Sequence, residues 1–107
     1  MSDNMDEYCP EFNDTIKQMI KWYGDDTMKV ICIEEFAELT QAISESLLGK
    51  PGSRDDIIEA VADAVICLRA LRIMLDITPR ALNGWIESET IKNAKRLKIA
   101  KGEKGWQ

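Results

Sequence analysis

Residues 27–48 read TMKVICIEEFAELTQAISESLL, and this stretch decides the fold. Its apolar side chains recur at the three- and four-residue spacing of an α-helix, and the sequence GKPG at 49–52 ends the run. We expect a helix of about 22 residues, roughly 33 Å long at 1.5 Å per residue. Asp25 and Asp26 precede the run and are predicted to cap it.

A second long helix is predicted over residues 54–76, after a capping-box-like pair formed by Ser53 and Asp56. Two long helices joined by a short loop pack antiparallel. The second helix is apolar nearly all round, because residues 57–75 contain only four charged side chains: Glu59, Asp63, Arg69 and Arg72. Such a helix must be covered on several sides, which predicts a homodimer or homotetramer with this helix near the interface.

Two further helices are expected on either side of this pair. Apolar side chains at helical spacing follow Pro10 until Gly24 stops the first, and Thr78 followed by Pro79 opens another that runs to about residue 100. No strand signal competes. The 107 residues favour one all-α domain, a four- to five-helix bundle over 1–107, with an acidic tail at 1–9 and a C-terminal tail at 102–107.

The charged residues exclude several kinds of chemistry. The chain has 19 Asp and Glu, 14 Lys and Arg, and no His, so it holds no His-based triad and no His-ligated zinc. Residues 1–64 carry 15 acidic and 5 basic side chains, and residues 65–107 carry 4 and 9. This division argues against nucleic acid as the partner and favours a site where acids and bases converge.

The three cysteines have no metal-binding or redox spacing. Cys32 and Cys67 lie inside apolar helical patterns and are expected to be buried free thiols, and Cys9 precedes the first helix. The N-terminal sequence resembles neither a signal nor a transit peptide, and no apolar run is long enough to cross a membrane. We therefore expect a cytoplasmic protein.

Four polar side chains form one stripe on the helix of residues 27–48, at 100° per residue: Glu34, Glu38, Gln41 and Glu45. A solvated helix face explains such a stripe as well as a site does. Glu35 differs, because it falls inside the apolar arc beside Ile31 and Leu39. An ionised carboxylate in a core costs several kcal/mol unless it is paired or binds a metal.

Asp63 poses the same question on the next helix, where it shares a face with Cys67 and Ala70. A salt bridge to a buried Arg or Lys is one explanation, and a metal shared with the preceding helix is the other. Antiparallel packing would let Glu35 and Glu38 meet Asp63 and Glu59. Carboxylates on facing helices are typical of divalent sites in bundles, and all-oxygen ligation favours Mg²⁺ or Mn²⁺.

Basic residues gather near the C-terminus, where six of 13 residues are Lys or Arg. The pattern suits a solvated helix end favoured by the helix dipole, a strip for RNA, or a clamp on a polyphosphate. In the last interpretation the binding residues are Lys92, Asn93, Lys95 and Arg96.

Glu34-Glu35-Phe36-Ala37-Glu38 resembles the EExxE motif of the all-α NTP pyrophosphatases, the MazG-like superfamily. The surrounding sequence adds to the resemblance: WYGDD at 22–26, the GKPG loop, and IIEAVADAVICL at 57–68 where the family has its second acidic motif. The resemblance covers roughly residues 16–101.

The resemblance implies Mg²⁺-dependent cleavage of nucleoside triphosphates between the α and β phosphates, which releases the monophosphate and pyrophosphate. It implies that Glu35 and Glu38 are metal ligands, that Glu34 is a further ligand or orients the attacking water, and that Asp63 is the last acid of an ExxD motif. Trp22 would stack on the base, although packing against a helix end explains this residue equally well.

One position departs from the family pattern. The Glu of ExxD is expected at position 60, where this chain has Ala60, and Glu59 stands one residue earlier. Glu59 would replace the missing ligand only with altered geometry. The alternative functions are therefore a catalytically weakened member that binds nucleotides or a protein partner, and a structural module for helical dimerisation.

Overall fold

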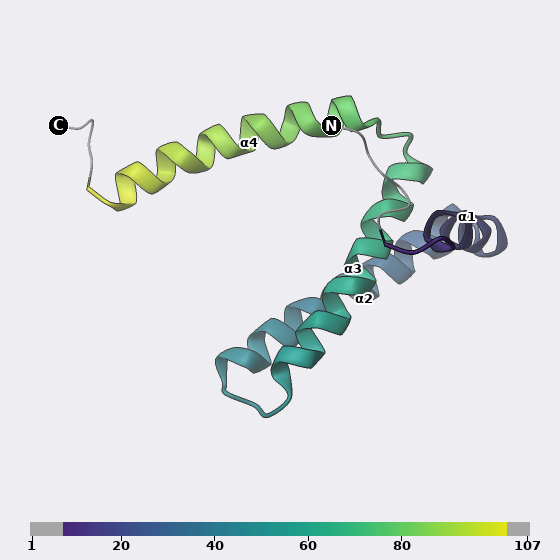
Figure 1. The fold of residues 1–107 in the computed structure, drawn as a ribbon, viewed down its shortest axis with the longest axis horizontal. Helices are drawn as coiled ribbons and strands as arrows, with labels where there is room; N and C mark the ends of the chain where they lie inside the picture. The colour runs from purple at the N-terminus through teal and green to yellow at the C-terminus, as the bar shows by residue number, and fades with distance from the viewer. Residues whose placement is uncertain (1–7, 103–107) are drawn as a thin grey trace. The chain divides into compact units, whose positions relative to one another are not determined.

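The computed structural model describes residues 8–102, and this part of the chain is helical without strands. It contains α1 (Phe12–Tyr23), α2 (Asp25–Leu47), α3 (Ser53–Met74) and α4 (Pro79–Ala100), which together hold 83% of the described residues (Figure 1). The predicted all-α class and the four predicted helices are confirmed. The outer parts of both predicted tails, 1–7 and 103–107, lie outside the described residues.

The residues that begin the helices agree with the sequence prediction at α4 and differ at α2 and α3. Thr78 caps α4, since its hydroxyl oxygen accepts a hydrogen bond of 3.1 Å from the backbone N–H of Ala81. The predicted caps of the other two were wrong, because Asp25 and Ser53 are already helical and the cap positions belong to Gly24 and Gly52. These glycines have φ of 86° and 78°, a conformation that lets the chain turn directly into the next helix.

The described residues divide into two compact units, 8–76 and 77–102. The first contains α1, α2 and α3. The second contains α4, a helix on which no side chain is buried. The single domain expected over 1–107 stays a prediction.

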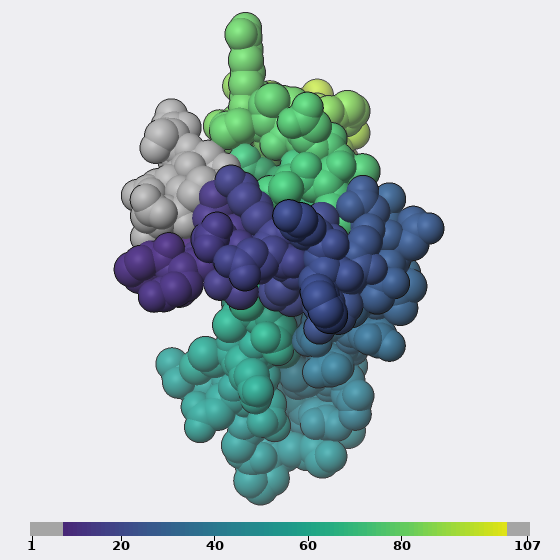
Figure 2. Space-filling model, turned by 90° about the vertical axis from the view of Figure 1, so that its right-hand side faces the viewer, coloured from purple at the N-terminus to yellow at the C-terminus, as the bar shows by residue number. Residues whose placement is uncertain are grey.

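In the first unit, α2 and α3 form an antiparallel pair joined by the short loop at 48–52, as predicted (Figure 1). Helix α1 lies across this pair at the end away from the loop (Figure 2). The core there is built by Phe12 and Ile16 of α1, Met28 of α2 and Ala70 of α3. Both α1 residues project from the same side of an amphipathic helix. This side of α1 therefore packs against α2 and α3.

Helix α3 packs on α2 through small side chains. Its buried positions include Ala60, Ala64, Cys67 and Ala70, which leave little between the two backbones. The distance between packed helices depends on the side chains at the contact, so small residues bring the axes together. Side chains that project from the margins of this interface therefore reach one another.

Apolar side chains also remain exposed on this helix pair. On α3 they are Ile58, Val61 and Leu68, and on α2 they include Ile33, Ile43 and Leu47. The described helices include none that is long and apolar enough to span a bilayer.

Candidate functional site

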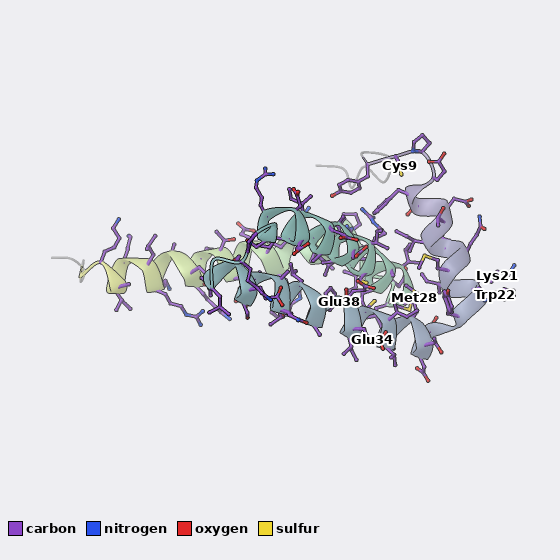
Figure 3. All side chains as sticks on the ribbon, turned by 90° about the horizontal axis from the view of Figure 1, so that it is seen from below. Cys9, Lys21, Trp22, Met28, Glu34 and Glu38 are labelled. Atoms are coloured by element: carbon purple, nitrogen blue, oxygen red, sulfur yellow. The ribbon has the colours of Figure 1, made fainter. Side chains whose placement is uncertain are left out.

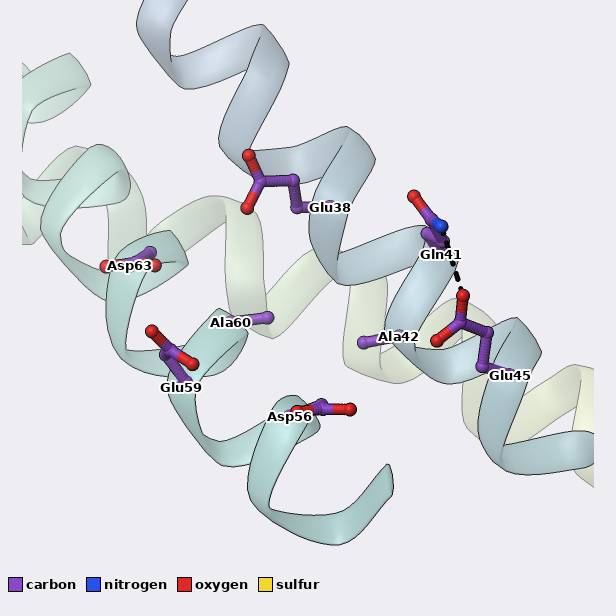
Figure 4. A pocket seen from close by; sticks show the side chains of 8 residues that line it. All are labelled: Glu38, Gln41, Ala42, Glu45, Asp56, Glu59, Ala60 and Asp63. Atoms are coloured by element: carbon purple, nitrogen blue, oxygen red, sulfur yellow. Dashed lines mark hydrogen bonds between the residues drawn. The ribbon is translucent and has the colours of Figure 1, made fainter. Parts of the chain in front are cut away.

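An open pocket of about 470 Å³ lies along α2 and α3. Six of its eight lining side chains are polar or acidic, and Figure 4 shows them projecting from both helices. The full lining is Glu38, Gln41, Ala42 and Glu45 from α2, and Asp56, Glu59, Ala60 and Asp63 from α3. Antiparallel packing produces this arrangement, because it sets the acidic edge of one helix beside that of the other.

Glu35 and Asp63 meet between α2 and α3 beside this pocket. Both side chains are half-buried, and they share a hydrogen bond. Burial raises the pKa of Glu35 above its ordinary value, and the negative charges of Glu38 and Asp63 raise it further. These causes all favour the protonated form of the Glu35 carboxyl group.

The predicted acidic residues lie in the pocket lining, next to it, or outside it. Glu38, Glu59 and Asp63 line the pocket, and Glu35 lies next to it through Asp63. Glu34 is exposed and outside the lining, one helical turn before Glu38 (Figure 3). Glu35 and Asp63, which the sequence places on apolar faces of their helices, are half-buried in the structure.

Three lining residues were missed as site residues from the sequence: Gln41, Glu45 and Asp56. Glu45 accepts a hydrogen bond of 3.0 Å from the Gln41 amide and forms an ion pair of 3.6 Å with Lys50. A spacing of seven residues could have predicted Glu45 and Asp56, because it returns a side chain to the same helix face. It separates Glu38 from Glu45 and Asp56 from Asp63.

Ala60 is buried at the floor of the pocket between acidic neighbours (Figure 4). A longer side chain at this position would enter the space between α2 and α3. Glu59 is exposed on the lining, so its carboxylate approaches the pocket from the rim. A side chain at position 60 therefore enters the pocket from its floor, whereas the Glu59 side chain reaches it from the rim.

Four predicted substrate-binding residues belong to the second unit. Lys92, Asn93, Lys95 and Arg96 are exposed on α4. Lys92 forms an ion pair of 3.3 Å with Glu89, and Arg96 donates a hydrogen bond of 3.4 Å to the Asn93 side chain. Trp22 is 84% exposed at the end of α1 (Figure 3), and its stacking on a base stays a prediction.

Carboxylate oxygens dominate the donor set of the pocket, and such oxygens are the ligands that Mg²⁺ prefers. As the side chains stand in residues 8–102, no three of His, Cys, Asp or Glu converge on one ligand point. The pKa of Glu35 is raised first by burial and then by the negative charges of its neighbours, and a cation would offset only the second of these causes.

Comparison with protein-family models, with curated proteins and with solved structures found no match to this chain.

Proposed function

We propose that this protein is a Mg²⁺-dependent pyrophosphohydrolase of nucleoside triphosphates. It would cleave the α–β bond of an NTP or dNTP with one water, and release the monophosphate and pyrophosphate. The observation that carries the proposal is the contact between Glu35 of α2 and Asp63 of α3, beside a pocket lined with acidic side chains. A bound cation would offset the repulsion between the like charges gathered there.

In this proposal Glu35, Glu38 and Asp63 hold Mg²⁺, and Glu59 provides a further oxygen from the rim. The ion supplies positive charge against the phosphate oxygens, and Mn²⁺ is a possible substitute. Because burial and the neighbouring acids raise the pKa of Glu35, binding of the ion would favour the ionised form of this carboxyl group.

The protein's own residues position the water and balance charge. Glu34, one helical turn before Glu38, is the candidate carboxylate that would accept a hydrogen bond from the water and take its proton as the phosphoanhydride bond breaks. Phosphoryl chemistry depends mainly on positioning and electrostatic stabilisation, and carboxylates with a divalent ion provide both without His.

The remaining parts of the proposal rest on the sequence resemblance. Lys92, Asn93, Lys95 and Arg96 would bind the polyphosphate, and Trp22 would stack on the base. The exposed apolar side chains of α2 and α3 support a homo-oligomer, because an apolar helix face gains free energy when a second copy covers it. The proposed site of action is the cytoplasm.

A second function is favoured by Ala60. In a catalytically weakened protein, the same pocket would bind a nucleotide or a protein partner without turnover. Ala60→Glu separates the two functions, because it places a carboxylate in the pocket floor where the family pattern has one. Turnover by the unmodified protein supports the enzyme, whereas turnover only after Ala60→Glu supports the weakened form.

The metal is tested by titrating Mg²⁺ while the melting temperature is recorded. An ion at 100 times its dissociation constant stabilises the folded protein by about 2.7 kcal/mol. We expect a rise with the unmodified protein and none with Asp63→Asn. Asp26→Asn is the matched control, since Asp26 is an exposed acid outside the pocket. Equal responses from both variants would refute the metal site.

A further inference from the structure

Two buried thiols face each other in the interface between α2 and α3. Cys32 of α2 and Cys67 of α3 are each 2% exposed. The Cys32 thiol donates a hydrogen bond of 3.8 Å to the backbone carbonyl oxygen of Cys67, and the two thiols also interact with each other. Both are free thiols in the structure.

Small side chains surround this pair. A disulfide needs Cα atoms about 4.4–6.8 Å apart, which is closer than most packed helices bring their residues. Here Ala64 and Ala70 lie on the same face of α3 as Cys67, and all are buried. Small neighbours of this kind let two helices approach, and the Cys32 sulfur lies 3.8 Å from the backbone carbonyl oxygen of Cys67.

We propose that Cys32 and Cys67 are a redox-sensitive pair that forms a reversible disulfide between α2 and α3 when the protein meets a peroxide. This inference does not rest on the proposed enzymatic function. It concerns residues one helical turn from Glu35 and Asp63, so the bond would fix the spacing of α2 and α3 close to the pocket.

The reaction balances with hydrogen peroxide as the oxidant. The Cys32 thiolate attacks one oxygen, the O–O bond breaks, and a sulfenic acid and hydroxide form. The Cys67 thiol then attacks the sulfenic sulfur, the S–O bond breaks, and water leaves. The hydroxide takes the proton that Cys32 lost. In total two thiols and one peroxide give one disulfide and two waters, and a dithiol reductant reverses the change.

Cys67 suits the second step better than the first. Burial raises the pKa of Cys67 to about 12, with smaller contributions from Cys32, Glu35 and Asp63. This thiol therefore stays protonated at neutral pH, which suits its part in the second step. Because both thiols are buried, the peroxide reaches Cys32 during local opening of the helix pair.

The test counts free thiols in the full-length protein. The reduced protein is treated with hydrogen peroxide, unfolded, and labelled with a maleimide. We expect three labels before treatment and one after it, with a mass loss of 2 Da before labelling. After trypsin, the fragments 30–54 and 55–69 should appear as one linked species that a dithiol separates.

Two variants sharpen the result. Cys9→Ser should still lose two labels, because exposed Cys9 is outside the pair. Cys32→Ala should lose the linked species. The oxidised wild-type protein should also melt on the order of 10 °C higher than the reduced protein, since the bond closes a loop in the unfolded chain. Three labels after treatment, or links through Cys9 only, would overturn the proposal; this wild-type measurement holds even if a variant fails to fold.

Discussion

Glu35 and Asp63, which stand on different helices, share a hydrogen bond beside an acidic pocket. Both carboxyl groups are half-buried, and their neighbours include the negative charge of Glu38. The pair is the structural centre of the proposed metal site. It also makes the stability of the protein depend on pH.

Replacing Glu35 with Gln should remove much of that dependence. The pKa of Glu35 is raised in the folded state, so its favourable contribution is complete below the ordinary value of 4.5 and is lost as the pH rises through the raised value. We therefore expect Glu35→Gln to gain stability relative to wild type as the pH rises above 4.5. Urea unfolding at a series of pH values without divalent ions measures this.

Glu34→Gln is the matched control for that series, because Glu34 is the exposed neighbour outside the pocket. Its stability should follow wild type more closely as pH changes. If the two variants show the same pH dependence, Glu35 does not have the environment described.

Met28 should be the most costly apolar residue to truncate in the first unit. It is fully buried in the core that joins α1, α2 and α3. Met28→Ala should cost about 2–5 kcal/mol, because it removes buried apolar surface and leaves a cavity. Ile99→Ala is the control: Ile99 is 72% exposed, and its truncation should change stability by less than about 0.5 kcal/mol. Denaturant unfolding distinguishes these outcomes, and equal losses would contradict the assigned core.

Two glycines should respond to alanine in opposite directions. Gly24 has φ of 86° between α1 and α2, and Gly84 lies inside α4, with open space around both. Gly24→Ala should destabilise by about 1 kcal/mol or more, because a side chain is strained at positive φ. Gly84→Ala should stabilise the helix by roughly 0.5–1 kcal/mol. Thermal unfolding followed by circular dichroism provides the comparison; a stabilised Gly24→Ala would show that the turn is misassigned.

Much of the fold could be predicted from the sequence because glycine and proline mark the ends of strongly periodic helices. The Thr78–Pro79 start of α4 was predicted correctly for that reason. The starts of α2 and α3 were not, because polar residues such as Asp25 and Ser53 are good caps, and the sequence does not reveal that the preceding glycine takes the cap position with positive φ.

The candidate site could be predicted in part. Helical angles place Glu35 and Asp63 on the packed faces of their own helices, which is where both lie. They do not give the register between helices. The short loop at 48–52 brings the end of α2 next to the start of α3. For this reason Glu45 and Asp56 line the same pocket.

The exposed apolar face of α3 should make the protein self-associate. Leu68 is exposed on this face with Val61, and a charge there would oppose its burial against a second copy. Light scattering should give a wild-type mass that is a multiple of 12.2 kDa, and Leu68→Glu should shift it towards 12.2 kDa. Gln18→Glu adds the same charge at an exposed position of α1, and it should leave the mass unchanged. A wild-type monomer would contradict the proposed oligomer.

Pyrophosphate release tests the central claim most directly. A panel of NTPs and dNTPs is incubated with the full-length protein and Mg²⁺, and pyrophosphate and monophosphate are measured together. We predict that at least one nucleotide gives the two products in equal amounts, that Asp63→Asn lowers the rate by about 100-fold or more, and that Asp26→Asn does not. The proposed pyrophosphohydrolase activity is contradicted if wild type hydrolyses no nucleotide faster than Asp63→Asn does, or if orthophosphate is the product.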